Sequence, residues 1–345
     1  MNSFTYVRAR NQAEALSSLK DAKFSLPVFK GGGLDLVDHM KEGLIAPDAL
    51  IDVRGVRGEG DLAGNGPDAV EMKGEVIRFP AAMTLAQAAN SAVLRKFAPV
   101  VAMTAGSAAT PAVRNVATVA GNLLQRPRCW YYRNSQFNCL KKGGSTCFAV
   151  EGENAYHAIF STGSSPGPCH IVHPSNLAPA LMVCDAVVHT VGNADRKEIP
   201  IGKLFHGPEK GVTSEHTLEA GELITHITMK ARPVSGFYAI KEKQSFDWPL
   251  VFACVAIEMA GERIGKAEVV AGAVAPVPWA LPAVAAALKG VDPKDERALT
   301  EACALAGKGA KPMRDNGYKV GLLSVAVKRA VMKAAGVAIA GEEGR

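Results

Sequence analysis

The stretch PVFKGGGLDL, residues 27–36, leads an extended segment directly into three glycines and then into an apolar helical pattern. Glycines leave the backbone N–H groups at a helix start accessible, which suits a pyrophosphate. For three glycines alone, a tight turn with no ligand is the alternative. The spacing is not the dinucleotide fingerprint, because Leu36 stands where that fingerprint requires its third glycine.

The segments around this bend predict a small α/β unit. Residues 4–7 predict a short strand, and Asn11 with Glu14 three residues later is typical of a helix capping box. Residues 49–53 predict a further strand. Together with the bend, these segments predict a β-α-β-α-β unit over residues 1–56.

A second glycine-containing bend follows at residues 114–122, RNVATVAGN. Its small residues let a ligand approach the backbone closely, so the bend predicts a second wall of the same cofactor pocket. A polar turn between two strands is the alternative. Upstream, residues 76–79 predict a strand, and Thr84 predicts the start of a helix from Leu85 to about Lys96.

The pattern of predicted strands and helices changes near residue 232. Strand patterns occur close together at residues 236–241, 250–259 and 267–274. Ala-rich helical patterns follow at residues 281–288, 295–306 and 318–335. Three strands followed by three helices predict an α+β domain that begins near residue 232.

Four of the seven cysteines fall in one stretch with little apolar periodicity. Their spacing of nine, seven and twenty-one intervening residues matches neither the short pairs of most zinc sites nor the bacterial ferredoxin run. Zinc, an iron–sulfur cluster and incidental thiols therefore all stay open. Three histidines nearby are alternative ligands. The cysteines are Cys129, Cys139, Cys147 and Cys169, and the histidines are His157, His170 and His173.

Composition excludes several classes of function. The net charge of +6 is spread over 345 residues without a basic run longer than two, so nothing indicates nucleic-acid binding. No stretch is long and apolar enough to predict a membrane span, and residues 1–20 have no apolar region typical of an export signal. No Ser/His/Asp or paired-carboxylate arrangement can be placed in space, so hydrolysis has little support.

Three motifs resemble the FAD-binding subunit of molybdenum hydroxylases, the family of the xanthine dehydrogenase, carbon monoxide dehydrogenase and aldehyde oxidoreductase complexes. They are FKGGGLDL at residues 29–36, RNVATVAGNLLQ at 114–125 and HPSNLAPAL at 173–181. The cysteine-bearing insertion makes the chain most similar to the subgroup of the bacterial periplasmic aldehyde oxidoreductase, whose flavin subunit carries an additional [4Fe–4S] cluster.

The resemblance implies an α+β fold in three parts. Residues 1–56 and 57–231 would form the two α+β subdomains of an FAD-binding fold of the vanillyl-alcohol-oxidase type, with an iron–sulfur insertion at about 126–172. Residues 232–345 would form a C-terminal α+β domain of the carbon monoxide dehydrogenase flavoprotein type.

It also implies residue roles. Four cysteines would bind the [4Fe–4S] cluster. Two segments of the chain, and three further residues outside them, would contact FAD. The sequence departs from the family at Leu34 and Asp35, where Thr or Ser with Asn is usual, and at Asn176, where an acidic residue is usual, so the hydrogen bonds to the flavin would differ. The expected cluster ligands are Cys129, Cys139, Cys147 and Cys169, and the expected FAD contacts are Lys30, Gly31, Gly32, Gly33, Leu34, Asp35, Leu36, Ser107, Thr118, Gly121, Asn122, Gln125, Ile171, Leu223 and Lys241.

By the same resemblance, the chain would be an electron-transfer subunit with no substrate chemistry of its own. Its partners would be a large molybdopterin-binding subunit, a small [2Fe–2S] subunit and an electron acceptor. It would be cytoplasmic, or periplasmic if exported with a partner that carries the signal. A zinc-stabilised scaffold module and a stand-alone flavin oxidase are the alternatives.

Overall fold

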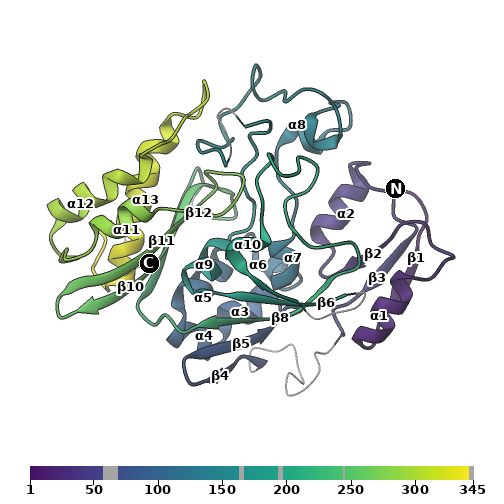
Figure 1. Ribbon diagram of the computed structural model, residues 1–345, viewed down its shortest axis with the longest axis horizontal. Helices are drawn as coiled ribbons and strands as arrows, with labels where there is room; N and C mark the ends of the chain where they lie inside the picture. The colour runs from purple at the N-terminus through teal and green to yellow at the C-terminus, as the bar shows by residue number, and fades with distance from the viewer. Residues whose placement is uncertain (57–68, 163–166, 193–196, 244, 342–345) are drawn as a thin grey trace.

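The structure, a computed structural model, describes residues 1–56, 69–162, 167–192, 197–243 and 245–341. Within these residues the chain forms three separate sheets, and each has helices of its own (Figure 1). The α+β class predicted from the sequence is confirmed. The boundary predicted at residue 57 adjoins residues 57–68, which lie outside the described ones.

The N-terminal sheet is parallel, with strand order β1-β3-β2. Asn11 starts the first helix, because its side-chain oxygen accepts the Glu14 backbone N–H at 2.8 Å. The predicted β-α-β-α-β order is confirmed. Its elements are β1 (Thr5–Arg8), α1 (Gln12–Leu19), β2 (Pro27–Lys30), α2 (Leu34–Lys41) and β3 (Ala49–Asp52).

The middle sheet is antiparallel, with strand order β4-β5-β8-β6-β7. Its strands are β4 (Glu71–Lys73), β5 (Val76–Pro80), β6 (Val187–Val191), β7 (Lys197–Pro200) and β8 (Leu223–Lys230). Its helices are α3 (Leu85–Asn90), α4 (Ala92–Phe97), α5 (Pro99–Ser107), α6 (Pro111–Arg114), α7 (Val119–Leu123), α9 (Leu177–Val183) and α10 (Ile201–Leu204).

One expectation for this region was wrong, and one alternative is excluded. The single helix predicted from Leu85 to Lys96 is two helices, because Ser91 has an extended backbone, with φ −65° and ψ 123°, and its hydroxyl caps α4. The bend at residues 114–122 is not a turn between strands. It connects α6 to α7, because Thr110 and Thr118 each cap a short helix there.

The C-terminal sheet is antiparallel, with strand order β12-β11-β10-β9. The predicted three strands and three helices are confirmed, and the short β12 was not predicted. The strands are β9 (Ser235–Lys241), β10 (Pro249–Ala260), β11 (Arg263–Gly272) and β12 (Trp279–Ala280), and the helices are α11 (Pro282–Ala287), α12 (Glu296–Ala304) and α13 (Tyr318–Ala334).

Strand β10 joins two hydrophobic cores, because its side chains alternate between faces. Phe252, Cys254 and Ala256 belong to the core that contains α5 and α9. Val251 and Val255 belong to the core under α11, α12 and α13. The C-terminal sheet is therefore covered on both faces, which packs it firmly against the middle region.

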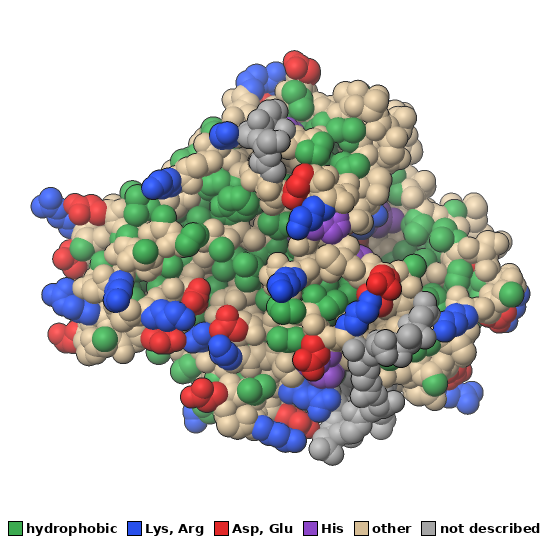
Figure 2. Space-filling view, viewed as in Figure 1, with side chains coloured by type: hydrophobic (Ala, Val, Ile, Leu, Met, Phe, Trp, Pro, Cys, Tyr) green, Lys and Arg blue, Asp and Glu red, His purple; other side chains and the backbone are tan. Residues whose placement is uncertain are grey.

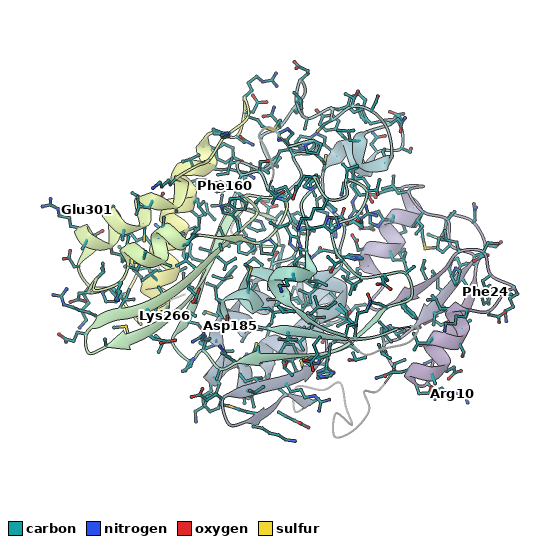
Figure 3. The ribbon with its side chains drawn as sticks, viewed as in Figure 1. Arg10, Phe24, Phe160, Asp185, Lys266 and Glu301 are labelled. Atoms are coloured by element: carbon teal, nitrogen blue, oxygen red, sulfur yellow. The ribbon has the colours of Figure 1, made fainter. Side chains whose placement is uncertain are left out.

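The cysteine-bearing insertion lies between α2 and the start of α13 (Figure 1). Its short helices are α8 (Trp130–Arg133) and η2 (Leu140–Lys142). Asn316 donates to the carbonyl oxygens of His157 and Ala158 at 3.1 and 3.2 Å, which ties the insertion to the C-terminal domain. Phe160, labelled in Figure 3, stacks on Trp279 with ring centroids 5.0 Å apart.

The surface carries mixed charge. On the face in Figure 2, Lys and Arg side chains are interspersed with Asp and Glu and form no continuous basic stripe. In the part of the chain that the structure describes, no helix has both the length and the apolar character needed to span a bilayer.

Candidate functional site

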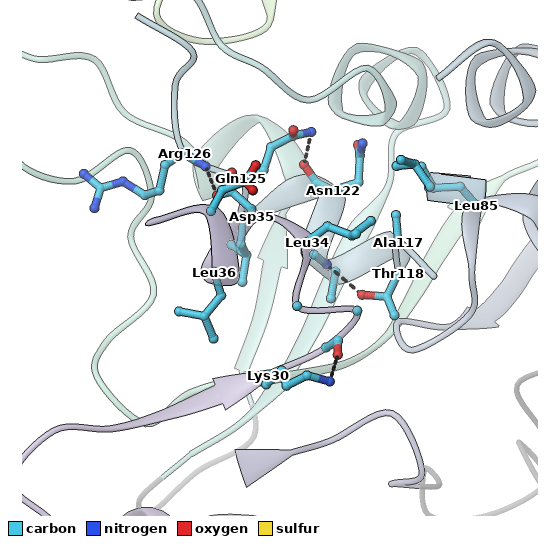
Figure 4. A pocket seen from close by; sticks show the side chains of 18 of the residues that line it. Lys30, Leu34, Asp35, Leu36, Leu85, Ala117, Thr118, Asn122, Gln125 and Arg126 are labelled. Atoms are coloured by element: carbon cyan, nitrogen blue, oxygen red, sulfur yellow. Dashed lines mark hydrogen bonds between the residues drawn. The ribbon is translucent and has the colours of Figure 1, made fainter. Parts of the chain in front are cut away.

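A cavity of about 810 Å³ lies between the N-terminal unit and the helices of the middle region (Figure 4). Its volume falls in the range of pockets for cofactor-sized ligands, about 300–1,000 Å³. Both glycine-containing bends line it. The two segments, about 80 residues apart, therefore meet in the wall of one cavity.

The triglycine bend requires glycine at two positions. Gly33 caps α2 with φ +81°, a left-handed conformation that other residues adopt at a cost. A Cβ on Gly32 would lie 2.3 Å from the carbonyl oxygen of Val116 in the second bend. Two backbones thus meet at a distance that excludes any side chain, which leaves a cradle of bare backbone in the cavity wall.

The second bend is held by Thr118, whose hydroxyl accepts the Gly121 backbone N–H at 3.1 Å and starts α7 (Figure 4). Behind it, Val119 and Ala120 donate their backbone N–H groups to carbonyl oxygens of the segment before α3. Asn122 accepts the Ser175 hydroxyl at 2.7 Å, so the HPSN segment at residues 173–176, before α9, joins the same wall.

The ammonium group of Lys30, at the end of β2, bonds to other groups of the protein. Its Nζ lies 3.1 Å from Asp52 Oδ2 and 3.2 Å from the Gly31 carbonyl oxygen. Burial opposes ionisation of Asp52, but hydrogen bonds from Arg54, Tyr6 and Lys30 outweigh it and lower the pKa of that carboxyl well below its usual range. This ion-paired cluster holds the strand that leads into the triglycine bend.

Most of the predicted FAD contacts line the cavity, and three do not. Lys241 donates its ammonium group to the Ser107 carbonyl oxygen at 3.1 Å, so these two residues pair beside the cavity. Burial lowers the pKa of Lys241. Ile171 lines a smaller cavity. Those that line the large cavity are Lys30, Gly31, Gly32, Gly33, Leu34, Asp35, Leu36, Thr118, Gly121, Asn122, Gln125 and Leu223.

Several lining residues were missed. Ala109 has φ +43°, a conformation that sequence patterns do not reveal for alanine. Trp248 and Asn176 line both the large cavity and the smaller one, which has a volume of about 230 Å³ and also contains Cys129 in its lining. The sequence did single out Asn176, as the departure from the acidic residue of the family's motif, but did not count it among the FAD contacts.

The four clustered cysteines lie in one neighbourhood. Cys147 and Cys169 share a hydrogen bond. Burial raises the pKa of the Cys129 thiol, and the nearby Cys147 and Cys139 add to this effect. The nearby His157 ring nitrogen Nε2 is 3.3 Å from Cys129 Sγ. Among the described residues, no three His, Cys, Asp or Glu side chains are gathered closely enough to hold one metal ion.

The sulfur atoms also accept backbone N–H groups, from Tyr131 and Tyr132 at Cys129 and from Ile171 at Cys169. The hydrogen bond from Cys169 lowers the pKa of Cys147 to about 6, against the effect of burial. The same bond and burial raise the pKa of Cys169. N–H donors aimed at sulfur are typical of thiolate ligands.

Comparison with known proteins assigns two parts of the chain to families. Residues 2–229 match the family described as the FAD binding domain in molybdopterin dehydrogenase. Residues 236–334 match the carbon monoxide dehydrogenase flavoprotein C-terminal domain.

Individual proteins show the same likeness. The chain is 32% identical over 294 residues to the aldehyde oxidoreductase FAD-binding subunit PaoB of Escherichia coli K12, covering 84% of this chain and 86% of that protein. It is 25% identical to the carbon monoxide dehydrogenase medium chain of Afipia carboxidovorans, covering 96% of each. Among solved structures, quinoline 2-oxidoreductase from Pseudomonas putida 86 has a TM-score of 0.72 at 19% identity, covering 97% of this chain and 98% of that one.

Proposed function

Because the chain belongs to the FAD-binding subunits of the molybdenum hydroxylase family, we propose that it is the medium, electron-transferring subunit of a three-subunit complex. It is a flavin-dependent oxidoreductase component. A large molybdopterin-binding subunit would oxidise the substrate, and a small [2Fe–2S] subunit would deliver the electrons. Bound FAD supplies the conversion of single electrons into a two-electron reduction of an acceptor.

The observation that supports flavin binding most directly is the close approach of the two bends. Gly32 leaves no room for a side chain against Val116, and Gly33 starts α2 without a side-chain cap, so the N–H groups of the first turn of α2 are left open beside the cavity. Bare backbone of this kind can approach a pyrophosphate, and its N–H groups can donate to the phosphate oxygens.

Replacing glycine with alanine tests this assignment. G32A would push the bends apart, and we expect FAD to bind at least about tenfold more weakly, a loss of about 1.4 kcal/mol. Gly321, in α13, has no atom within 4 Å of an added Cβ, so G321A is the matched control. Flavin absorbance and titration of the stripped protein with FAD measure the effect. Equal FAD affinity in G32A and wild type would contradict the site.

We further propose that Cys129, Cys139, Cys147 and Cys169 bind a [4Fe–4S] cluster. A single zinc ion would need four sulfur atoms about 2.3 Å from one point. Cluster ligands bind different iron atoms, so they stand farther apart. Four cysteines in one insertion, with backbone N–H groups directed at Cys129 and Cys169, support a bound metal centre, and the similarity of the insertion to that of cluster-bearing flavin subunits favours the cluster.

Metal analysis distinguishes the alternatives. We expect about four iron atoms per chain and a brown absorbance beneath the flavin bands. C139S should lose this iron, whereas C303A, at a buried cysteine in the C-terminal core, should keep it. One zinc ion per chain with no iron would instead support the zinc-stabilised scaffold.

The partner assignment has its own test. A tagged chain purified anaerobically from its native cells should carry with it one molybdopterin-containing and one [2Fe–2S]-containing protein. A chain that is alone in the extract and turns over an oxidisable substrate by itself would instead be a stand-alone flavin oxidase.

A further inference from the structure

Asp35 is the first acidic residue after the triglycine bend, yet its carboxylate is engaged by a segment about 90 residues away. That segment, residues 126–133, is here called the arginine strap, and it contains Cys129. Oδ2 of Asp35 accepts the Arg126 backbone N–H at 2.8 Å. Oδ1 lies 2.9 Å from Arg128 Nη2 and 2.7 Å from Arg133 Nη2.

These contacts use most of the hydrogen-bonding capacity of the carboxylate, which accepts through two oxygen atoms. The side chain of Asp35 is only 18% exposed and that of Arg133 only 9%, so water screens the ion pair weakly. Burial raises the pKa of Asp35, but Arg128, Arg126 and Arg133 together outweigh burial and lower it. Asp35 is thus an anion whose charge is balanced by the strap.

A second acidic side chain holds the other side of the strap. Glu215, which is buried, pairs with Arg126 Nε at 2.8 Å and with the buried ammonium group of Lys141. Arg126 and Lys141 lie on either side of Cys129 and Cys139 in the chain. The two acidic residues therefore fix both ends of the first half of the cysteine-bearing insertion.

We propose that Asp35 is a positioning residue that ties the arginine strap, and with it Cys129, to the first turn of α2 beside the flavin cavity. The family resemblance implied that Asp35 is one of the FAD contacts. Its carboxylate instead serves the insertion, and it fixes how far the cysteines stand from the flavin pocket. The importance of that distance rests on the proposed function, but the order of the strap can be measured without flavin or iron.

The test compares two substitutions on the same helix. D35N keeps the size of the side chain and removes its charge. D38N is the matched control, because Asp38 has a half-exposed side chain and its nearest strap atom is Arg128 Nη1 at 3.8 Å. Trypsin cleaves after Arg and Lys unless proline follows, as it does after Arg126, so limited digestion of the full chain, mapped by mass spectrometry, reports the opening of the strap at Arg128 and Arg133.

We expect D35N to be cut in the strap at least about tenfold faster than wild type, both with FAD bound and after FAD is stripped, and D38N to be cut at the wild-type rate. In iron-loaded protein, D35N should also shift the cluster reduction potential and its EPR spectrum, because the guanidinium groups near Cys129 would move.

A strap that stays as resistant in D35N as in wild type would overturn the proposal, whether FAD is retained or lost. So would faster cutting only in preparations that have lost FAD, since Asp35 would then act through the flavin. If D35N does not fold, R133Q removes the same ion pair from the other side and is judged by the same outcomes at Arg128, because the substitution also removes the trypsin site at residue 133. An iron-free wild type would refute the cluster while leaving the digestion test intact.

Discussion

At the scale of single residues, burial affects the protonation of one histidine in the wall of the cavity. His173, in the segment before α9, is 3% exposed, and its ring lies 4.3 Å from that of Phe205, edge to face. Its Nδ1 accepts the Ser175 backbone N–H at 3.3 Å. Burial lowers the pKa of His173 to about 3. The neutral ring is thus part of the wall behind Asn122.

This burial predicts a pH dependence of stability. The pKa in the folded state lies below the unfolded value, so the contribution of His173 is complete above the unfolded pKa and is lost as the pH falls toward 3. At about pH 5 the loss should be about 2 kcal/mol in the free energy of unfolding. Denaturant melts of wild type and H173Q at neutral and acidic pH measure it, and H173Q should lose less stability on acidification. Parallel losses in the two proteins would contradict this origin.

At the scale of elements, a single cap connects helix stability to the cofactor site. Thr84 forms a capping box with Gln87: its hydroxyl accepts the Gln87 N–H at 3.2 Å, and the Gln87 side chain accepts the Thr84 N–H at 2.8 Å. Thr84 also forms a bridge with Thr118, the residue that starts α7 in the cavity wall. A change at this cap should therefore affect both the helix and the flavin.

We expect T84A to lower the free energy of unfolding by about 1 kcal/mol and to weaken FAD binding. The control is D295A, which removes the cap of α12, where Asp295 accepts the Ala298 N–H at 3.0 Å in the C-terminal domain. D295A should cost about as much stability and leave FAD affinity unchanged. Chemical denaturation and flavin titration separate the two effects. Weaker FAD binding in D295A as well would show that general destabilisation, and not the bridge to Thr118, is responsible.

At the scale of the whole molecule, the C-terminal domain and the FAD region share a core. Phe252 on β10 is 1% exposed and lies against Gly272 of β11, where a Cβ would come within 1.9 Å of its ring. Arg232 ties the two regions at the surface, because it pairs with Asp185 at 2.9 Å and with Glu258 at 2.8 Å. The regions should therefore unfold together.

F252A should lower the free energy of unfolding by about 3–5 kcal/mol, because it opens a cavity in the shared core. Calorimetry should show one transition for both wild type and F252A, with flavin release at the same temperature. Two separate transitions in wild type would mean that the domains unfold independently. F160A is a second probe of the same cooperativity. Phe160 contacts Trp279 in the core under α11, α12 and α13.

The sequence by itself determined the features that depend on local geometry. Glycines at residues 31–33 are readable because glycine adopts the left-handed φ of Gly33 without strain and because the contact of Gly32 with Val116 leaves no room for a side chain. Asn11 and Thr84 are readable as caps because the hydrogen bond reaches only three residues along the chain. The three groups of strands and helices follow from their periodicity.

Only the tertiary structure decided where the longer side chains point. Asp35 follows the triglycine bend in sequence, but residues 126–133 capture its carboxylate, and Lys241 donates to Ser107 beside the cavity instead of lining it. The α6–α7 bend and the smaller cavity beside Cys129 were likewise visible only in the tertiary structure. Such pairings join residues about a hundred positions apart, and their energy depends on burial and on the direction of each side chain, which no short pattern records.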